Sequence, residues 1–155
     1  MRFLMVDRII SLEPGVSIEA EKTLDASEEL FRDHFPGFPV VPGVLLTEMM
    51  AQAAGKCVDA EKHSRGKAML GEIRSARFRS WVRPGETAQI SAKIVKNLRN
   101  LAIAQCNINI DGRKICSAEI LILFLPRDQL AVDFADEVLD RYLASQAAAA
   151  AAHST

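Results

Sequence analysis

The spacing of apolar residues changes along the chain. Residues 16–24 (VSIEAEKTL) alternate apolar and polar side chains, which predicts a β-strand, because successive strand side chains point to opposite faces. Residues 44–62 (VLLTEMMAQAAGKCVDAEK) are apolar on almost every face through Val58, which predicts a helix buried nearly all round. Alternation returns in four strand-like segments, 68–82, 86–98, 101–110 and 113–125. Asp111-Gly112 joins the last two segments and is a strong hairpin signal.

A helix this apolar requires a cover on most of its sides, and a strongly curved sheet provides one. The pattern therefore predicts an α+β protein of the hotdog fold, in which a curved antiparallel sheet wraps around a long central helix. Residues 3–11 (FLMVDRIIS) are expected to form a short helix or turn before Glu13-Pro14-Gly15, a turn signal. Residues 26–33 are expected to form a short connection with helical character.

A proline-rich loop, residues 34–43 (HFPGFPVVPG), precedes the apolar helix. Its three prolines exclude a helix interior and a central strand, and they stiffen the chain next to His34. A general base must be held in a fixed position, so His34 is a candidate base. The competing interpretation is a turn histidine without a chemical role.

Glu48 and Gly43 are further candidates near the helix start. Glu48 lies about one turn into the helix, where burial makes the ionised form costly and favours a carboxyl group that can donate a proton. It could instead be a solvated side chain that serves the helix N-terminus. Gly43 follows Pro42, and the first N–H groups of a helix are free to bind a thioester carbonyl. Alternatively, Pro-Gly only ends the loop.

Composition excludes several classes of protein. The net charge is -1 and Lys and Arg do not cluster, so we expect no nucleic-acid partner. Cys57, Cys106 and Cys116 lie in apolar stretches without zinc-ligand spacing, which predicts buried thiols and no metal site. The N-terminal segment lacks the apolar core of a signal peptide, and residues 40–55 are too short and too polar to cross a bilayer. We therefore expect a cytoplasmic protein without membrane insertion.

Residues 34–55 (HFPGFPVVPGVLLTEMMAQAAG) closely resemble the 3-hydroxyacyl-[acyl-carrier-protein] dehydratases of the FabZ and FabA types. Residues 3–9 (FLMVDRI) and 76–86 (ARFRSWVRPGE) agree with this resemblance. In that family an acid follows the histidine by fourteen positions, and 48 − 34 = 14 places it at Glu48. A Glu at this position, and Val44 where the FabA type has Cys, indicate the FabZ type.

The resemblance implies dehydration of (3R)-3-hydroxyacyl thioesters to trans-2-enoyl thioesters in fatty-acid or related acyl-chain biosynthesis. The substrate would be carried on the phosphopantetheine of acyl carrier protein, with no other cofactor. The implied roles are proton removal by His34, proton donation by Glu48 and carbonyl binding by Gly43. The implied substrate contacts are Phe35, Pro36, Gly37, Val44 and Gln52. The resemblance also implies an obligate homodimer, which can assemble into a trimer of dimers, with histidine and acid from opposite subunits and an acyl tunnel along their interface.

Three features depart from the family pattern. Asp33 stands where FabZ proteins usually have Gly, and residues 68–79 (AMLGEIRSARFR) replace the more aromatic stretch that is usual before the family's ARFR. Helical spacing in residues 130–145 lies beyond the usual core. We therefore divide the chain into a hotdog dehydratase domain (1–126), a C-terminal helical extension (127–146) and a low-complexity tail (147–155) that frays. Two alternatives are a hotdog acyl-thioesterase, in which the HFPG loop has no clear task, and a non-catalytic acyl-binding subunit, which needs neither His34 nor Glu48.

Overall fold

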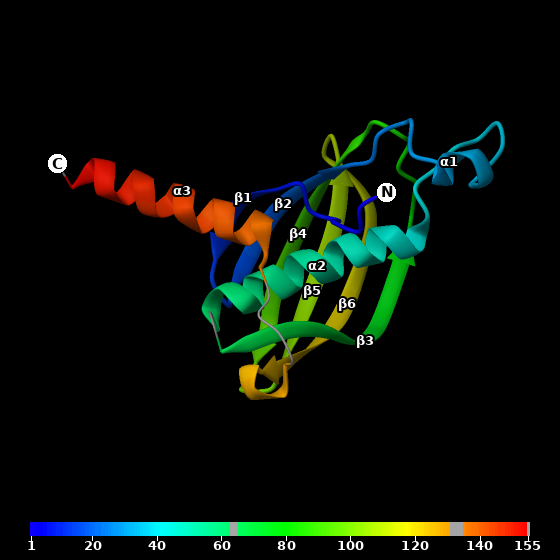
Figure 1. Cartoon of the computed structure of the whole chain (residues 1–155). Coiled ribbons are helices and arrows are strands. Elements are labelled where there is room, and N and C mark those ends of the chain that lie inside the picture. The colour runs from blue at the N-terminus through cyan, green and yellow to red at the C-terminus, as the bar shows by residue number, and fades with distance from the viewer. Residues whose placement is uncertain (63–64, 131–134, 155) are drawn as a thin grey trace.

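A computed structural model describes residues 1–62, 65–130 and 135–154. Six strands form one antiparallel sheet, in the order β1-β2-β4-β5-β6-β3, and the sheet curves around helix α2 (Figure 1). This arrangement confirms the predicted α+β hotdog fold. The elements in chain order are β1 (Arg8–Glu13), β2 (Ser17–Thr23), α1 (Leu30–Asp33), α2 (Gly43–Glu61), β3 (Gly66–Phe78), β4 (Thr87–Asn97), β5 (Leu101–Ile110), β6 (Arg113–Pro126), the 3-10 helix η1 (Arg127–Gln129) and α3 (Glu137–His153).

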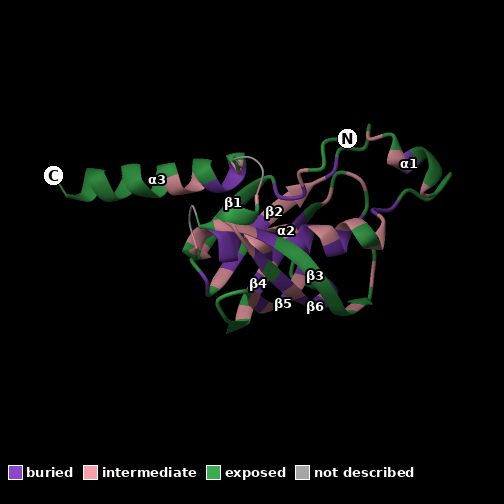
Figure 2. Cartoon of the chain, turned by 60° about the horizontal axis from the view of Figure 1, so that its bottom comes forward, coloured by how far each residue is buried: buried purple, intermediate pink, exposed green. Residues whose placement is uncertain are grey.

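The core lies between α2 and the inner face of the sheet. Every second residue of β5 and of the first half of β4 is buried there, as their alternation predicts, and many of these residues are small: Ala88, Ala92, Ala102 and Ala104. Small side chains let the helix approach the sheet closely, and Met49 and Met50 of α2 fill the remaining space in the same core. Figure 2 shows this buried layer along α2 and the strands beneath it.

The β5–β6 hairpin forms at the predicted turn. Asp111 and Gly112 both have positive φ, 49° and 77°, which is the conformation that a two-residue type I′ turn requires. Helix α2 begins one residue before the predicted start, at Gly43. Strand β3 ends at Phe78, before the predicted residue 82, because the chain then turns so that the N–H groups of Arg79 and Ser80 both bond to the carbonyl of Ile115.

The prediction of a helix or turn for residues 3–11 is wrong for residues 8–11. Residues Arg8–Glu13 form strand β1, which pairs with β2 at the edge of the sheet. The register shifts between Ile9 and Ser11, so that Ile10 is an extra residue. Such a bulge interrupts the two-residue alternation by which a strand is identified in sequence.

The C-terminal segment is more ordered than predicted. Helix α3 runs from Glu137 through the alanine run to His153, so the expected fraying of residues 147–153 is wrong, consistent with the high helix propensity of alanine. Residues 131–134 of the predicted helix lie outside the described residues. The first turn of α3 buries Val138 and Leu139 in the core, whereas the alanine-rich half extends into solvent (Figure 2).

Candidate active site

His34 is held by both its backbone and its ring. It follows α1, and its N–H donates to the carbonyl of Leu30 at 3.1 Å. Val40 N–H donates to the carbonyl of His34 at 3.0 Å, and His34 Nδ1 lies 2.9 Å from the carbonyl oxygen of Val40. A carbonyl oxygen only accepts, so Nδ1 carries the proton and Nε2 keeps its lone pair in the neutral ring. The loop thus leaves the lone pair of Nε2 available, and this nitrogen has no partner among the residues that the structure describes.

The residues after His34 form an exposed turn. Phe35 and Phe38 exchange two backbone hydrogen bonds, at 3.0 and 2.9 Å, and Gly37 between them has φ 75°, which glycine adopts without strain. The Phe35 ring stacks on the His34 ring, with centroids 4.1 Å apart. Phe35, Pro36 and Gly37 therefore lie at the surface beside the imidazole.

Gly43 is the first residue of α2, and two donors are free at this helix end. The N–H groups of Leu45 and Leu46 both bond to the carbonyl of Pro42, whereas those of Gly43 and Val44 have no acceptor within the described chain. A Cβ on Gly43 would lie 3.2 Å from the ring of Phe78, closer than most such contacts. Glycine therefore keeps this N–H open beside an aromatic wall, and Val44 next to it is 76% exposed.

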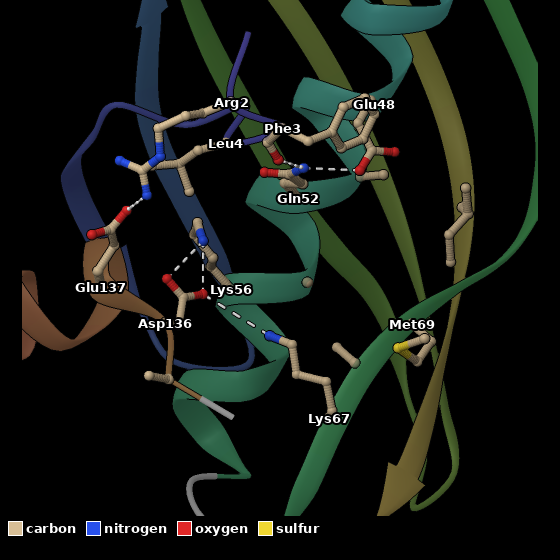
Figure 3. A pocket seen from close by; sticks show the side chains of 15 residues that line it. Arg2, Phe3, Leu4, Glu48, Gln52, Lys56, Lys67, Met69, Asp136 and Glu137 are labelled. Atoms are coloured by element: carbon tan, nitrogen blue, oxygen red, sulfur yellow. Dashed lines mark hydrogen bonds and ion pairs between the residues drawn. The ribbon is translucent and has the colours of Figure 1, made fainter. Parts of the chain in front are cut away.

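Glu48 is half-buried on α2, between the buried and the solvated positions that the sequence left open. Its position faces a cavity beside the helix and not the sheet. Glu48 Oε1 accepts a hydrogen bond from Gln52 Nε2 at 2.9 Å (Figure 3). Gln52 also joins the N-terminal segment to α2, because its Nε2 donates to the carbonyl of Phe3 at 3.1 Å and its Oε1 accepts from the N–H of Met5 at 2.8 Å.

The cavity beside α2 has a volume of about 800 Å³. Glu48, Ala51, Gln52 and Gly55 line it from one face of the helix, at the spacing of successive turns. His34 is not among the described residues that line it. A single chain therefore does not bring His34 and Glu48 together in one cavity. Of the substrate contacts expected from sequence, only Gln52 lies in this cavity, whereas Gly37 lines a separate cavity with Phe38.

Comparisons with known proteins agree with this architecture. The FabA-like domain family matches residues 1–119. The FabZ 3-hydroxyacyl-[acyl-carrier-protein] dehydratase of Pediococcus pentosaceus is 40% identical over 121 residues, which are 77% of this chain and 81% of that protein. The FabZ dehydratase of Oenococcus oeni is also 40% identical, over 77% of this chain and 87% of that protein. The chain belongs to the FabZ dehydratase family.

Solved structures that are similar to this chain show the same fold. The dehydratase heterocomplex ApeI:P from Xenorhabdus doucetiae matches with a TM-score of 0.66 and 16% identity, over 81% of this chain and 86% of that chain. The smu.793 protein from Streptococcus mutans, solved with acetyl CoA, matches with a TM-score of 0.60 and 12% identity, over 77% and 88% of the two chains. At these identities the likeness concerns the fold alone.

Two ion pairs that sequence analysis missed lie at the far end of the cavity beside α2. Lys56 Nζ lies 2.8 and 2.7 Å from the two carboxylate oxygens of Asp136 (Figure 3). Lys67 bonds to Asp59. Lys56 and Asp59 are charged residues in the C-terminal half of the helix, but they are only 5% and 9% exposed. Their burial depends on Asp136, which is 80 residues from Lys56 in sequence, so no local pattern indicated it.

The two carboxyl groups at this end titrate differently. Burial raises the pKa of Asp59, although Lys67 and the N–H of Ala68 partly offset the effect. Burial alone would also raise the pKa of Asp136, but the hydrogen bonds and charge of Lys56 lower it below its ordinary value. Asp136 is therefore ionised at neutral pH and pairs with Lys56.

No helix in the described ranges is long and apolar enough to cross a membrane. Within the same ranges, no group of three or more His, Cys, Asp or Glu side chains is arranged to hold a metal ion.

Proposed function

We propose that this FabZ-family chain removes water from (3R)-3-hydroxyacyl groups on acyl carrier protein and forms trans-2-enoyl thioesters for fatty-acid biosynthesis. The FabZ relatives support this hydro-lyase activity over the thioesterase and non-catalytic alternatives. The observation that carries the mechanism is the bond between His34 Nδ1 and the carbonyl of Val40, because it leaves Nε2 as a fixed base.

In the proposed reaction, His34 Nε2 takes a proton from C2 of the substrate, next to the thioester carbonyl. The electrons of that C–H bond form the C2–C3 double bond as the C3–O bond breaks. Glu48 gives its proton to the departing hydroxyl group, which leaves as water. His34 then holds the added proton and Glu48 is ionised, so a proton must pass from the imidazolium to the carboxylate before the next turnover.

Gln52 positions the acid in this scheme. Its amide donates to Glu48 Oε1, so Oε1 acts as an acceptor and Oε2 is the oxygen that carries the transferable proton. Gln52 is itself held by backbone groups of Phe3 and Met5, which limits its rotation. It is therefore a positioning residue, and the substrate contact expected for it is indirect.

In this scheme the free N–H of Gly43 stabilises the carbonyl oxygen, which gains negative charge when C2 loses its proton. The positive end of the α2 dipole acts at the same point. Each step uses a group of this chain, so the proposed reaction requires no metal or organic cofactor. The phosphopantetheine arm of the carrier would present the thioester.

The proposed site needs two subunits. Strand β3 is an edge of the sheet, with no strand on its outer side in the described chain, and it exposes Met69, Leu70, Ile73 and Phe78. A long apolar edge strand is a template for pairing with another chain. We propose a homodimer that pairs through β3, so that the His34 loop of one subunit meets the Glu48 cavity of the other. Further assembly of three such dimers is compatible with this interface.

The test is complementation between two inactive variants. His34→Ala and Glu48→Gln are each expected to lose activity by about 10²-fold or more. Mixed under conditions that exchange subunits, half of the dimers are heterodimers, and each of these has one intact site and one doubly altered site. Activity should therefore return to about a quarter of the wild-type value. If mass spectrometry confirms the exchange and no activity returns, the pair acts within one chain.

A further inference from the structure

The cavity that contains Glu48 is lined by charged residues at its other end. Figure 3 shows Glu48 near one end and Lys56, Asp136 and Lys67 toward the other. Glu48 and Lys56 are eight positions apart on α2, which corresponds to about 12 Å along the helix axis. Both side chains lean toward the N-terminus of the helix, so this spacing also approximates the separation of Glu48 from Lys56 along the cavity.

These charges are already satisfied by one another. The side chains of Lys56 and Asp136 are 6% and 15% exposed, and Lys67 lies between Asp59 and Asp136, 4.0 Å from the latter. Two ammonium groups and two carboxylates sum to zero charge, so this end offers no free charge to an anionic ligand. An alkyl chain that advanced farther would have to separate a buried ion pair, which costs more than one or two buried methylenes contribute.

Asp136 belongs to the segment that follows the hotdog core. Its carboxylate also accepts from the N–H of Leu139 at 3.1 Å and so caps α3, whose first turn is buried through Val138 and Leu139. The helix therefore fixes Asp136 against α2. The lowered pKa of Asp136 agrees with a stable ion pair at this position.

We propose that the Lys56–Asp136 pair is the floor of the acyl-chain site, so that the C-terminal extension limits this enzyme to short and medium chains. An extended chain advances about 1.2 Å per bond, so about 12 Å accommodates at most about ten bonds beyond the reacting carbons. This inference rests on the proposed function, because it assigns the cavity beside Glu48 to the acyl chain.

The first measurement is the chain-length profile of the wild-type enzyme. 3-Hydroxyacyl-carrier substrates with six, ten and sixteen carbons are supplied, and kcat/KM is measured for each. The six- and ten-carbon substrates should react, and kcat/KM for the sixteen-carbon substrate should be lower by about tenfold or more. Equal values for six and sixteen carbons would overturn the proposal.

The second measurement uses the double variant K56M/D136S. Met keeps the length of Lys without its charge, and Ser keeps the cap of α3. The sixteen-to-six-carbon ratio of kcat/KM should rise by about tenfold or more. The matched control is K22M/D7S, since Lys22 and Asp7 form an ion pair at 2.8 Å outside this cavity, and Asp7 likewise accepts from the N–H of Thr23. Its ratio should equal that of the wild type.

A folded K56M/D136S enzyme that keeps the wild-type ratio would overturn the proposal. If this variant does not fold, the wild-type chain-length profile still tests the proposal, because a floor at this depth must lower kcat/KM for the sixteen-carbon substrate. If kcat/KM does not depend on chain length, the proposed floor is wrong and the proposed function stands. If none of the three substrates is dehydrated, the proposed function is wrong as well.

Discussion

The two ends of α2 use charged and polar groups in opposite ways. At the N-terminal end, the N–H groups of Gly43 and Val44 are free of acceptors within the described chain, and the half-buried Glu48 faces a cavity. At the C-terminal end, Lys56 and Asp59 are buried and each is paired. In sequence, Glu48 and Lys56 look alike, as single charged residues in an apolar helix. The difference shows that chemistry requires groups with unused hydrogen-bonding capacity, whereas a buried structural site requires that every group be satisfied.

Replacing the acid should have the largest effect. Glu48→Gln keeps the shape of the side chain but cannot deliver a proton to hydroxide, so kcat should fall by about 10²- to 10⁴-fold with folding intact. Steady-state kinetics on a six-carbon substrate and a melting curve measure this. Glu29→Gln is the control, because Glu29 is solvent-exposed near the His34 loop and only forms a weak surface pair with Arg32. Turnover above a tenth of wild type would make Glu48 a structural polar residue.

Breaking the ion pair at the other end should affect stability instead. Lys56→Met leaves the Asp136 carboxylate buried without its partner, so the free energy of unfolding should fall by about 3 kcal/mol. Denaturant unfolding measures the change. Lys22→Met is the control, since its partner Asp7 is 44% exposed, and it should lose about 1 kcal/mol or less. Equal losses in the two variants would contradict a special role for burial at this end of α2.

The pH dependence of that difference follows from Asp136. Its pKa in the folded chain is below the ordinary value of 3.8, so the ion pair contributes its stability above that value and loses it as pH falls through the lowered pKa. The difference between wild type and Lys56→Met should therefore be largest near neutral pH and shrink as the pH falls into the acid range. A difference that grows with acid would contradict the direction of this shift.

A smaller effect is expected at Gln52, which lies between the two ends. Gln52→Ala removes the bond that orients Glu48 and two bonds to the N-terminal segment, so kcat should fall about tenfold while KM changes little. Gln105→Ala, on the exposed side of β5, is the matched control and should have no effect. A change in KM alone would indicate that Gln52 contacts the substrate directly.

The smallest effect is expected from thiol reagents. Burial raises the pKa of Cys57 to about 11 and the pKa values of Cys106 and Cys116 to about 12, so all three stay protonated at pH 8. The native enzyme should keep full activity and all 3 free thiols, which should react only in denaturant. Rapid modification of a native thiol would show that the core around α2 opens.

The sequence by itself determined the elements whose pattern is local. Helix α2 and strands β4, β5 and β6 follow from apolar periodicity, and the turn between the last two follows from Asp111-Gly112. The FabZ family follows from the loop-and-helix motif and was confirmed by the relatives. The catalytic roles of His34 and Glu48 remain predictions that the complementation experiment tests.

Only the tertiary structure decided which charged residues are buried and what they meet. Strand β1 escaped prediction because a bulge at Ile10 interrupts its alternation. The burial of Lys56 depends on Asp136, which reaches it only after the sheet has closed around α2 and α3 has docked. Periodicity reports which face of an element is apolar, but the partner of a buried charge is chosen by contacts between residues far apart in the chain.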